Sequence, residues 1–257
     1  MDQVIDQGVT LKDIIKRYPM LHAPLANAAR ALRRWRAKSR GAGLVAAYLA
    51  VHPTRRINIG CGGYGHDGWL NCDRDPLHDD YVYLDASRPL PFPDSCADMI
   101  FTEHMIEHLE LGDAQRFLAE CARILKPGGT IRVATPDLDR FLGLFKAKDP
   151  LGQAYETWLS DSYFPEIPYR SEAMVLNNML SNFGHRFVFD EHTLRLALEA
   201  AGLTAVRRCP VGKSDHPDLR GLERHALSIG DDMNEFETMV VEAGKPAGGV
   251  EAGKPGS

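Results

Sequence analysis

Short apolar runs and polar connections alternate between residues 56 and 134, in the way that strands alternate with crossovers. The runs that we expect to form strands are 57–59, 69–73, 81–84, 97–102 and 130–134. Amphipathic spacing predicts a helix from about 113 to 125, and the glycines that follow suit the turn that ends it. Strands linked by crossovers pair in parallel, so the pattern predicts a doubly wound, Rossmann-like α/β sheet that is mostly parallel.

The pattern changes after residue 136. Asp190 is a suitable N-cap for a helix over 191–201, and Gly202 would end that helix. Two further apolar runs, 204–209 and 236–242, predict strands that pair as an antiparallel C-terminal edge of the sheet.

Three segments flank or interrupt this sheet. Residues 1–50 are rich in helix formers and predict a helical N-terminal extension. The sheet domain then covers 51–243 and contains a long insertion, 137–186, that we expect to form a helical cover. The tail 244–257 is expected to be disordered, because Gly, Pro and Ala dominate it and Glu-Ala-Gly-Lys-Pro occurs twice near it.

The extension carries six basic residues between 30 and 40, around Leu32 and Trp35. One interpretation is a basic amphipathic surface for weak contact with an anionic membrane or a phosphorylated substrate. The other, which we favour, is a solvated helix face whose Trp35 packs on the domain.

Composition limits the function classes. The chain has 257 residues and a formal net charge of −5, so no overall charge favours nucleic acid, and we expect no nucleic-acid partner. Its five cysteines form no C-x-x-C pair and no disulfide framework, and the acidic N-terminus does not resemble an export signal. We therefore expect a cytoplasmic protein.

A glycine-rich segment follows the first expected strand. Gly60-x-Gly62-x-x-Gly65 matches the dinucleotide fingerprint, but the next strand begins too soon for the helix that this fingerprint needs. A purely structural turn is the second alternative. Thirteen residues after Gly60 comes Asp73, where doubly wound folds hold ribose hydroxyls.

An ordered series of motifs along the chain points to a third interpretation of the glycine-rich segment. The motifs are Ile57-Asn58-Ile59-Gly60-Cys61-Gly62, then Asp73, then Asp85 in Tyr-Leu-Asp-Ala, then Leu-Pro-Phe-Pro-Asp-Ser from residue 90, and Leu-Lys-Pro-Gly-Gly from residue 125. In this order they resemble the class I S-adenosylmethionine-dependent methyltransferases, and specifically the bacterial type 11 methyltransferase domain. The resemblance covers about 56–209 and implies S-adenosylmethionine as cofactor and S-adenosylhomocysteine as product.

The resemblance also implies roles for individual residues. The residues that it places around the cofactor are Ile59, Gly60, Cys61, Gly62, Asp73, Asp85, Ala86 and Glu103. The glycine loop would bend under the methionine part, Asp73 would accept from the ribose, and Asp85 with Ala86 would contact adenine. As structural alternatives, Asp85 would cap the following turn and Asp73 would pair with a neighbouring arginine.

The segment after the fourth strand is unusually polar. His104-x-x-Glu107-His108 matches a zinc-peptidase pattern, but no third ligand is evident, and we expect no resident metal. The methyltransferase resemblance instead implies that Glu103 and His104 line the methyl-transfer site, while His108 packs or caps.

The insertion is rich in aromatic and amide side chains, which suit a sugar or polyol but also suit a core of its own. Asn177, Asn178 and His185 are the best candidates for substrate contacts. His104 and His185 are candidate general bases, with Glu103 as orienter. We expect O-methylation of a sugar or other small glycan acceptor in polysaccharide biosynthesis; a silent cofactor-binding scaffold and N- or C-methylation of a metabolite are the alternatives.

Overall fold

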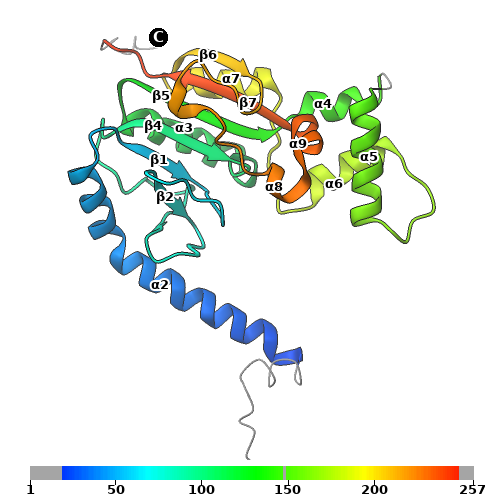
Figure 1. Ribbon diagram of the computed structural model, residues 1–257, viewed down its shortest axis with the longest axis horizontal. Coiled ribbons are helices and arrows are strands. Elements are labelled where there is room, and N and C mark those ends of the chain that lie inside the picture. Colours follow the sequence, from blue (N-terminus) through cyan, green and yellow to red (C-terminus); the bar gives the residue numbers. More distant parts are fainter. Residues whose placement is uncertain (1–18, 147–148, 249–257) are drawn as a thin grey trace, which may run out of the picture.

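A seven-stranded sheet forms the centre of the computed structural model, which describes residues 19–146 and 149–248 (Figure 1). The strands are β1 (Arg56–Ile59), β2 (Leu70–Asp73), β3 (Val82–Tyr83), β4 (Ala97–Glu103), β5 (Leu125–Pro136), β6 (Thr204–Cys209) and β7 (Thr238–Gly244). Their order is β3-β2-β1-β4-β5-β7-β6. The pairs from β3 to β5 are parallel, and β7 is antiparallel to both β5 and β6. The predicted mostly parallel α/β sheet is confirmed.

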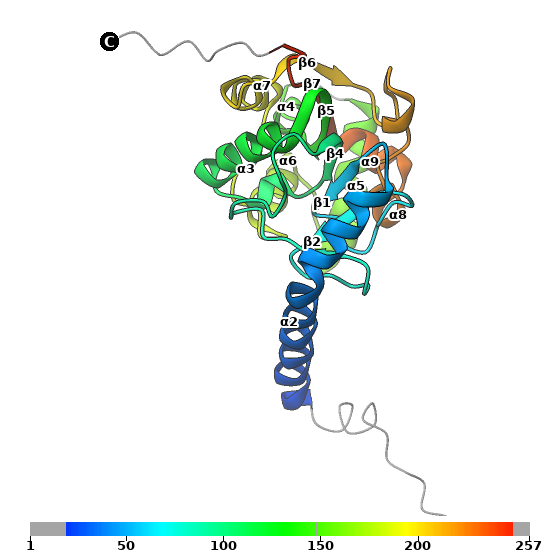
Figure 2. The ribbon, with the colours of Figure 1, turned by 90° about the vertical axis from the view of Figure 1, so that its left-hand side faces the viewer.

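Alternate residues of the strands are buried on opposite faces of the sheet. Ile57, Ile100 and Ile131 belong to the larger core, which α3 (Leu111–Ile124) and α7 (Glu191–Ala200) cover (Figure 2). On the other face, Phe101 packs with Leu219 from the segment after β6, which includes the short helix η2 (Pro217–Leu219). Burial on both faces explains why the central strands are continuous apolar runs.

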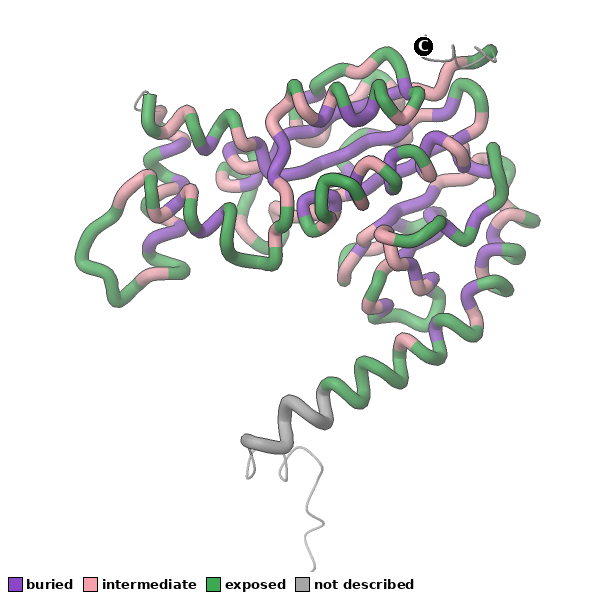
Figure 3. The backbone as a smooth tube through the Cα atoms, turned by 180° about the vertical axis from the view of Figure 1, so that it is seen from behind, coloured by how far each residue is buried: buried purple, intermediate pink, exposed green. Residues whose placement is uncertain are grey.

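The N-terminal helix α2 (Pro19–Val51) projects from the domain as a long rod (Figure 2). Its C-terminal end is anchored by Tyr48, whose hydroxyl lies 2.9 Å from the backbone oxygen and nitrogen of Arg56. Residues 27–36 of this helix are mostly exposed (Figure 3). Residues 1–18 of the predicted extension lie outside the described residues.

The basic face of α2 is paired rather than free. Arg30, Arg33 and Arg34 all lie within ion-pair distance of Asp75, in the connection after β2. The expectation that Trp35 packs on the domain is wrong, because this side chain is 66% exposed. No described helix is both long enough and apolar enough to span a bilayer. Peripheral membrane contact through α2 stays a prediction.

The insertion forms a helical subdomain beside the sheet (Figure 1). Its helices are α4 (Leu138–Gly143), α5 (Pro150–Tyr163) and α6 (Glu172–Ser181). It packs against α9 (Asp231–Glu237), which in turn contacts α8 (Ala226–Ile229). Phe141, Tyr155 and Phe236 contribute to one shared core. Much of the aromatic content of the insertion is therefore its own core.

Two boundaries near the C-terminus differ from expectation. The last strand begins at Thr238 rather than 236, because Phe236 packs with Phe141 and Tyr155 as part of α9. The predicted tail begins too early, since Gly244 still belongs to β7 and Lys245 exchanges backbone hydrogen bonds with Gly128 and Gly129 of β5. The rest of the tail, 249–257, lies outside the described residues.

Candidate functional site

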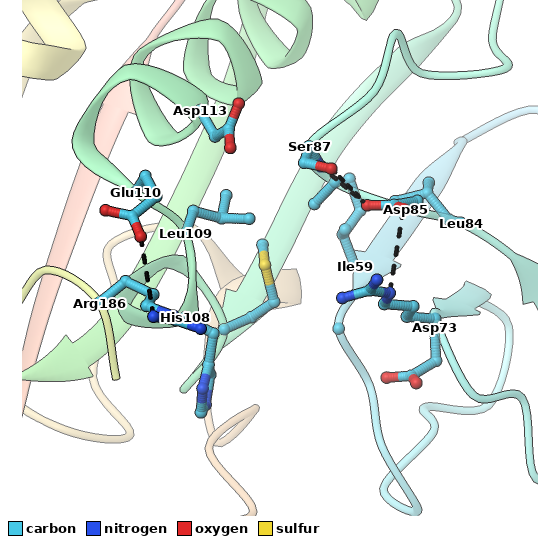
Figure 4. Close-up of a pocket in the computed structure, with 14 residues that line it drawn as sticks. Ile59, Asp73, Leu84, Asp85, Ser87, His108, Leu109, Glu110, Asp113 and Arg186 are labelled. Carbon is cyan, nitrogen blue, oxygen red and sulfur yellow. Dashed lines mark hydrogen bonds and ion pairs between the residues drawn. The ribbon is translucent and has the colours of Figure 1, made fainter. Parts of the chain in front are cut away.

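The carboxyl ends of β1, β2 and β3 and the short helix η1 (Ile106–His108) surround a cavity of about 400 Å³, the donor cavity (Figure 4). Its lining residues are Ile59, Gly60, Asp73, Arg74, Leu84, Asp85, Ala86, Ser87, Met105, His108, Leu109, Glu110, Asp113 and Arg186. Ligands of open α/β sheets bind at this edge. Five of the predicted cofactor residues therefore come together in one cavity: Ile59, Gly60, Asp73, Asp85 and Ala86.

The loop after β1 requires glycine at its first position. Gly60 has φ of +78°, and a Cβ at that position would lie 2.4 Å from Cγ of Met105. The backbone nitrogens of Gly60 and Cys61 both donate to the oxygen of Cys72 in β2. The bend is thus held by the next strand while backbone and Met105 form the cavity wall.

Asp73 closes the loop from the other side. Its Oδ2 accepts a hydrogen bond of 2.8 Å from the nitrogen of Gly62, and its Oδ1 accepts one of 2.7 Å from the nitrogen of Asp75. No described arginine pairs with its carboxylate, so the alternative of a pair with Arg74 or Arg55 is not observed. Each oxygen retains a lone pair for a ribose hydroxyl.

Asp85 has two roles in the structure. Its Oδ1 accepts hydrogen bonds from the nitrogen and hydroxyl of Ser87, at 3.2 and 2.7 Å, so it does cap the following turn (Figure 4). It also lines the donor cavity, with Nε of Arg74 at 3.9 Å from Oδ2. Burial raises the pKa of Asp85. Hydrogen bonds from Ser87 and the charges of two arginines together lower it by more, so the pKa of Asp85 lies below its usual value.

Three predicted cofactor residues lie elsewhere. Cys61 is buried in the loop, and burial raises the pKa of its thiol, while Gly62 holds Asp73 without lining the cavity. Glu103 is also absent from the lining: both of its oxygens accept hydrogen bonds from the nitrogens of Arg224 and His225. Its predicted roles at the methyl-transfer site and as orienter of His104 are therefore replaced by a role in fixing the segment before α8.

A second cavity of about 250 Å³, the acceptor cavity, lies between the sheet and the helical subdomain. Its lining residues are His104, Glu107, His108, Pro136, Tyr155, Trp158, Tyr163, Asn178, Met179, Phe183, His185, His225, Ile229 and Glu237. His108 is a lining residue of both cavities. We expected His108 only to pack or cap, whereas in the structure it forms part of the walls of both cavities.

His104 is held in an uncommon conformation, with φ of +44°. Its Nε2 lies 3.0 Å from Oγ1 of Thr238, and its Nδ1 faces the carboxylates of Glu107 and Glu237 at 3.4 and 3.7 Å. Burial lowers the pKa of His104, but these acids raise it more, so the net pKa lies above its usual value.

The substrate candidates of the insertion separate in the structure. Asn178 and His185 line the acceptor cavity, whereas Asn177 is exposed and bonds the backbone of its own helix at Ala173. Nδ1 of His185 lies 2.6 Å from the oxygen of Met179, which makes Nδ1 the protonated nitrogen and leaves Nε2 as an acceptor. Burial lowers the pKa of His185 below its usual value, which favours the neutral imidazole.

Sequence reasoning missed His225 and Glu237. They come from α8 and α9, a part of the chain with no strong periodicity, and they join residues that are more than 100 positions away. Met105 was also missed, although its place within the polar segment after β4 is a usable signal.

Comparison with known proteins shows which family the sequence around this sheet edge resembles. Residues 40–133 match the sequence model of the type 11 Methyltransferase domain. This part of the chain is a class I, type 11 methyltransferase domain. A probable S-adenosylmethionine-dependent methyltransferase of Mycobacterium tuberculosis is 44% identical over 108 residues, which are 35% of this chain and 39% of that protein. One from Mycolicibacterium smegmatis is 34% identical over 98 residues, covering 32% and 37%.

The stretch 40–133 that matches the family model includes the glycine loop, Asp73 and Asp85. The chain matches less than two fifths of the length of these relatives. Among solved structures, a possible histamine N-methyltransferase of Thermotoga maritima covers 90% of this chain and 98% of its own, at 19% identity and a TM-score of 0.42. A methyltransferase of Archaeoglobus fulgidus covers 79% and 92%, at 17% identity and a TM-score of 0.41.

Proposed function

We propose that this chain transfers a methyl group from S-adenosylmethionine, bound in the donor cavity, to a small molecule bound in the acceptor cavity. The observation that carries the proposal is that the two cavities share His108 as a lining residue, one cavity beside the glycine loop of the methyltransferase domain and the other under the helical subdomain. A donor and an acceptor placed in adjoining cavities react without diffusing apart.

The donor cavity has the groups that an adenosyl cofactor requires. Asp73 is fixed by two backbone amides, so its carboxylate is already oriented toward vicinal hydroxyls. Asp85 lies on the same wall and retains an oxygen for the adenine amino group. Only ten residues, 60–69, separate β1 from β2, and they form no helix, which differs from the dinucleotide-binding pattern.

The acceptor cavity supports the finer assignment to an alcohol acceptor. Aromatic faces of Tyr155, Trp158 and Tyr163 line it together with the amide of Asn178, a combination that suits a sugar ring or polyol. Nε2 of His185 is the unprotonated nitrogen that would accept the proton of a hydroxyl.

The reaction balances with these groups. The acceptor hydroxyl loses its proton to Nε2 of His185 as its oxygen forms a bond to the methyl carbon. The bond between that carbon and the sulfonium sulfur breaks, and its electron pair stays on sulfur. The products are the methyl ether, S-adenosylhomocysteine and one proton, which His185 releases to solvent. Alignment of donor and acceptor provides most of the acceleration, and a general base adds about 10²- to 10⁴-fold.

Two measurements test the proposal. Calorimetric titration should show one site for S-adenosylhomocysteine and none for NAD; binding of NAD alone would contradict the donor assignment. Transfer of labelled methyl to a panel of sugars and polyols should then fall at least about 100-fold in His185→Ala, with S-adenosylhomocysteine binding retained. Full turnover in that variant would show that another group removes the proton.

A further inference from the structure

Four side chains at the inner end of the acceptor cavity form one compact group: His104, Glu107, His225 and Glu237, the histidine–glutamate cluster. His104 directly follows β4, Glu107 belongs to η1, His225 is the N-cap residue of α8, and Glu237 ends α9. Nε2 of His225 lies 3.2 Å from Oε1 of Glu237, and the rings of His104 and His225 are 4.0 Å apart. The sequence motif His-x-x-Glu-His contributes half of the cluster.

The tautomer of His104 follows from its neighbours. Thr238 donates its only hydroxyl proton to Oδ1 of Asn234 at 2.8 Å, so it accepts from Nε2 of His104. In the neutral ring Nδ1 then carries a lone pair, which is directed at the oxygens of Glu107 and Glu237. Three electron-rich atoms facing one another require a positive charge between them.

Glu107 gives a second, independent observation. Its side chain is fully buried, its Oε2 accepts a hydrogen bond from Thr135, and its Oε1 has no hydrogen-bond partner. This oxygen faces the cluster, with Nδ1 of His104 at 3.4 Å outside hydrogen-bond geometry. A buried carboxylate oxygen without a partner is costly unless a cation or proton compensates it.

We propose that the cluster is a site for a divalent zinc-like cation, with Nδ1 of His104, Nε2 of His225 and Oε1 of Glu237 as ligands. All three atoms lie within 4.8 Å of one another. Bonds of about 2.0–2.1 Å in a tetrahedron place ligand atoms about 3.3 Å apart. The measured separations of 3.2 and 3.7 Å around Glu237 are close to that value.

The nature of the donors selects the metal class. Two imidazoles and one carboxylate suit zinc, iron, cobalt or nickel better than magnesium, which prefers oxygen ligands. The outer contacts are those of a metal site: Thr238 accepts from the second nitrogen of His104, and the hydroxyl of Tyr155 donates to Glu237. Three protein ligands leave one position toward the acceptor cavity.

The role of the cation rests on the proposed function, whereas its binding does not. An open coordination position in the acceptor cavity would take an oxygen donor of the acceptor, a hydroxyl or a carboxylate, and orient it toward the donor cavity. The unpaired oxygen of Glu107 lies beside the same ligand set. In this role the cation would position an acceptor that offers such an oxygen.

Two other arrangements are outcomes of the test. In one, His104 is a permanent imidazolium between the two glutamates and no metal binds. In the other, a metal binds to Glu107, His108 and His185, whose ligand atoms also lie within 4.8 Å of one another.

The experiment uses full-length protein without a histidine tag, stripped of metal by a chelator and titrated with Zn²⁺ alone, and separately with Co²⁺ followed by visible absorption. We expect one equivalent of Zn²⁺ and the intense visible bands of four-coordinate Co²⁺. His225→Ala, at a partly exposed residue, should weaken Zn²⁺ binding by more than about 100-fold, beyond the loss typical of an outer-shell change. The matched control His192→Ala, at an exposed residue of α7, should bind as the wild type does.

Wild-type protein that takes up no Zn²⁺ would overturn the proposal in favour of the imidazolium. Loss of binding in His185→Ala but not in His225→Ala would overturn it in favour of the other triad. S-Adenosylhomocysteine titrated into the same samples reports on the donor cavity separately, so a failed metal site and a failed methyltransferase assignment give different results. Thermal melting of each variant shows whether it is folded.

Discussion

The backbone nitrogen of Gly62 donates a hydrogen bond of 2.8 Å to Oδ2 of Asp73. This bond ties the glycine loop after β1 to the acid at the end of β2, so the two sequence signals of the donor cavity are one physical unit. The carboxylate fixes the loop and is itself fixed by it. In the proposed function, cofactor affinity and loop conformation would therefore be coupled through Asp73.

Asp73→Asn tests this coupling. An amide has one acceptor oxygen, so it would turn its NH₂ group toward the nitrogen of either Gly62 or Asp75. Loss of a hydrogen bond to a charged acceptor costs about 1.5–3 kcal/mol, so affinity for S-adenosylhomocysteine should fall about 10- to 100-fold. Calorimetry measures the change, with the exposed Asp79→Asn as control. Affinity within twofold of wild type would contradict the role of Asp73.

Gly60→Ala tests the wall of the donor cavity. The new Cβ would overlap Met105, and φ of +78° disfavours any side chain, at about 1–2 kcal/mol. Met105 has to move into the cavity, so we expect no measurable S-adenosylhomocysteine binding and a lowered melting temperature. Gly43→Ala in α2 is the matched control, because nothing lies within 4 Å of its Cβ and alanine favours a helix by about 0.5–1 kcal/mol. Equal binding by both variants would rule out this explanation.

The donor cavity could be predicted because its signals are local. Asp73 and Asp85 each follow a strand that its own residues define, and parallel strands bring their carboxyl ends to one edge. The signals at the two ends of α7 are similarly local. The structure confirms Asp190 as the N-cap, and Gly202, just beyond the end of the helix, has a positive φ.

The acceptor cavity could not be predicted in the same way. Glu237 reaches His104 only because β7 inserts between β5 and β6, a topology that short apolar runs do not encode. Glu103 directly precedes His104, yet its carboxylate is satisfied by the backbone before α8. Which polar residue of a strand end faces a cavity depends on such distant partners.

The buried ion pairs of Arg132 predict that replacing it will destabilise the fold. It is fully buried on β5, and its guanidinium lies 2.7 Å from both Glu223 and Glu242, which are also buried. Arg132→Met would leave the carboxylate of Glu223 without an ion-pair partner among the described residues and Glu242 with Arg207 alone, at a cost of about 3–5 kcal/mol. The melting temperature should fall by about 10 °C or more. Arg116→Met, which removes an exposed pair with Asp113, should change stability by less than about 1 kcal/mol. Similar effects of both substitutions would contradict a buried network.

Asp190 predicts a pH dependence of stability. Its side chain accepts a hydrogen bond of 2.7 Å from the nitrogen of Thr193 at the start of α7. Hydrogen bonding from the side chain of Thr193, and next from this backbone nitrogen, lowers the pKa of Asp190, as does nearby His192 to a smaller extent. Because the folded pKa lies below the unfolded value of about 3.9, the cap stabilises the fold fully above that pH and loses its effect as the pH falls through the folded pKa.

Asp190→Ala should therefore lower the free energy of unfolding by about 1 kcal/mol at pH 7, and by progressively less as the pH falls below about 4. Urea unfolding of wild type and variant at pH 7, 5, 4 and 3 measures the difference. Asp190→Asn, which keeps a capping oxygen but does not titrate, should stay close to wild type at pH 7 and lose less stability on acidification. A difference between wild type and Asp190→Ala that is constant or grows toward pH 3 would show that the ionised carboxylate does not stabilise α7.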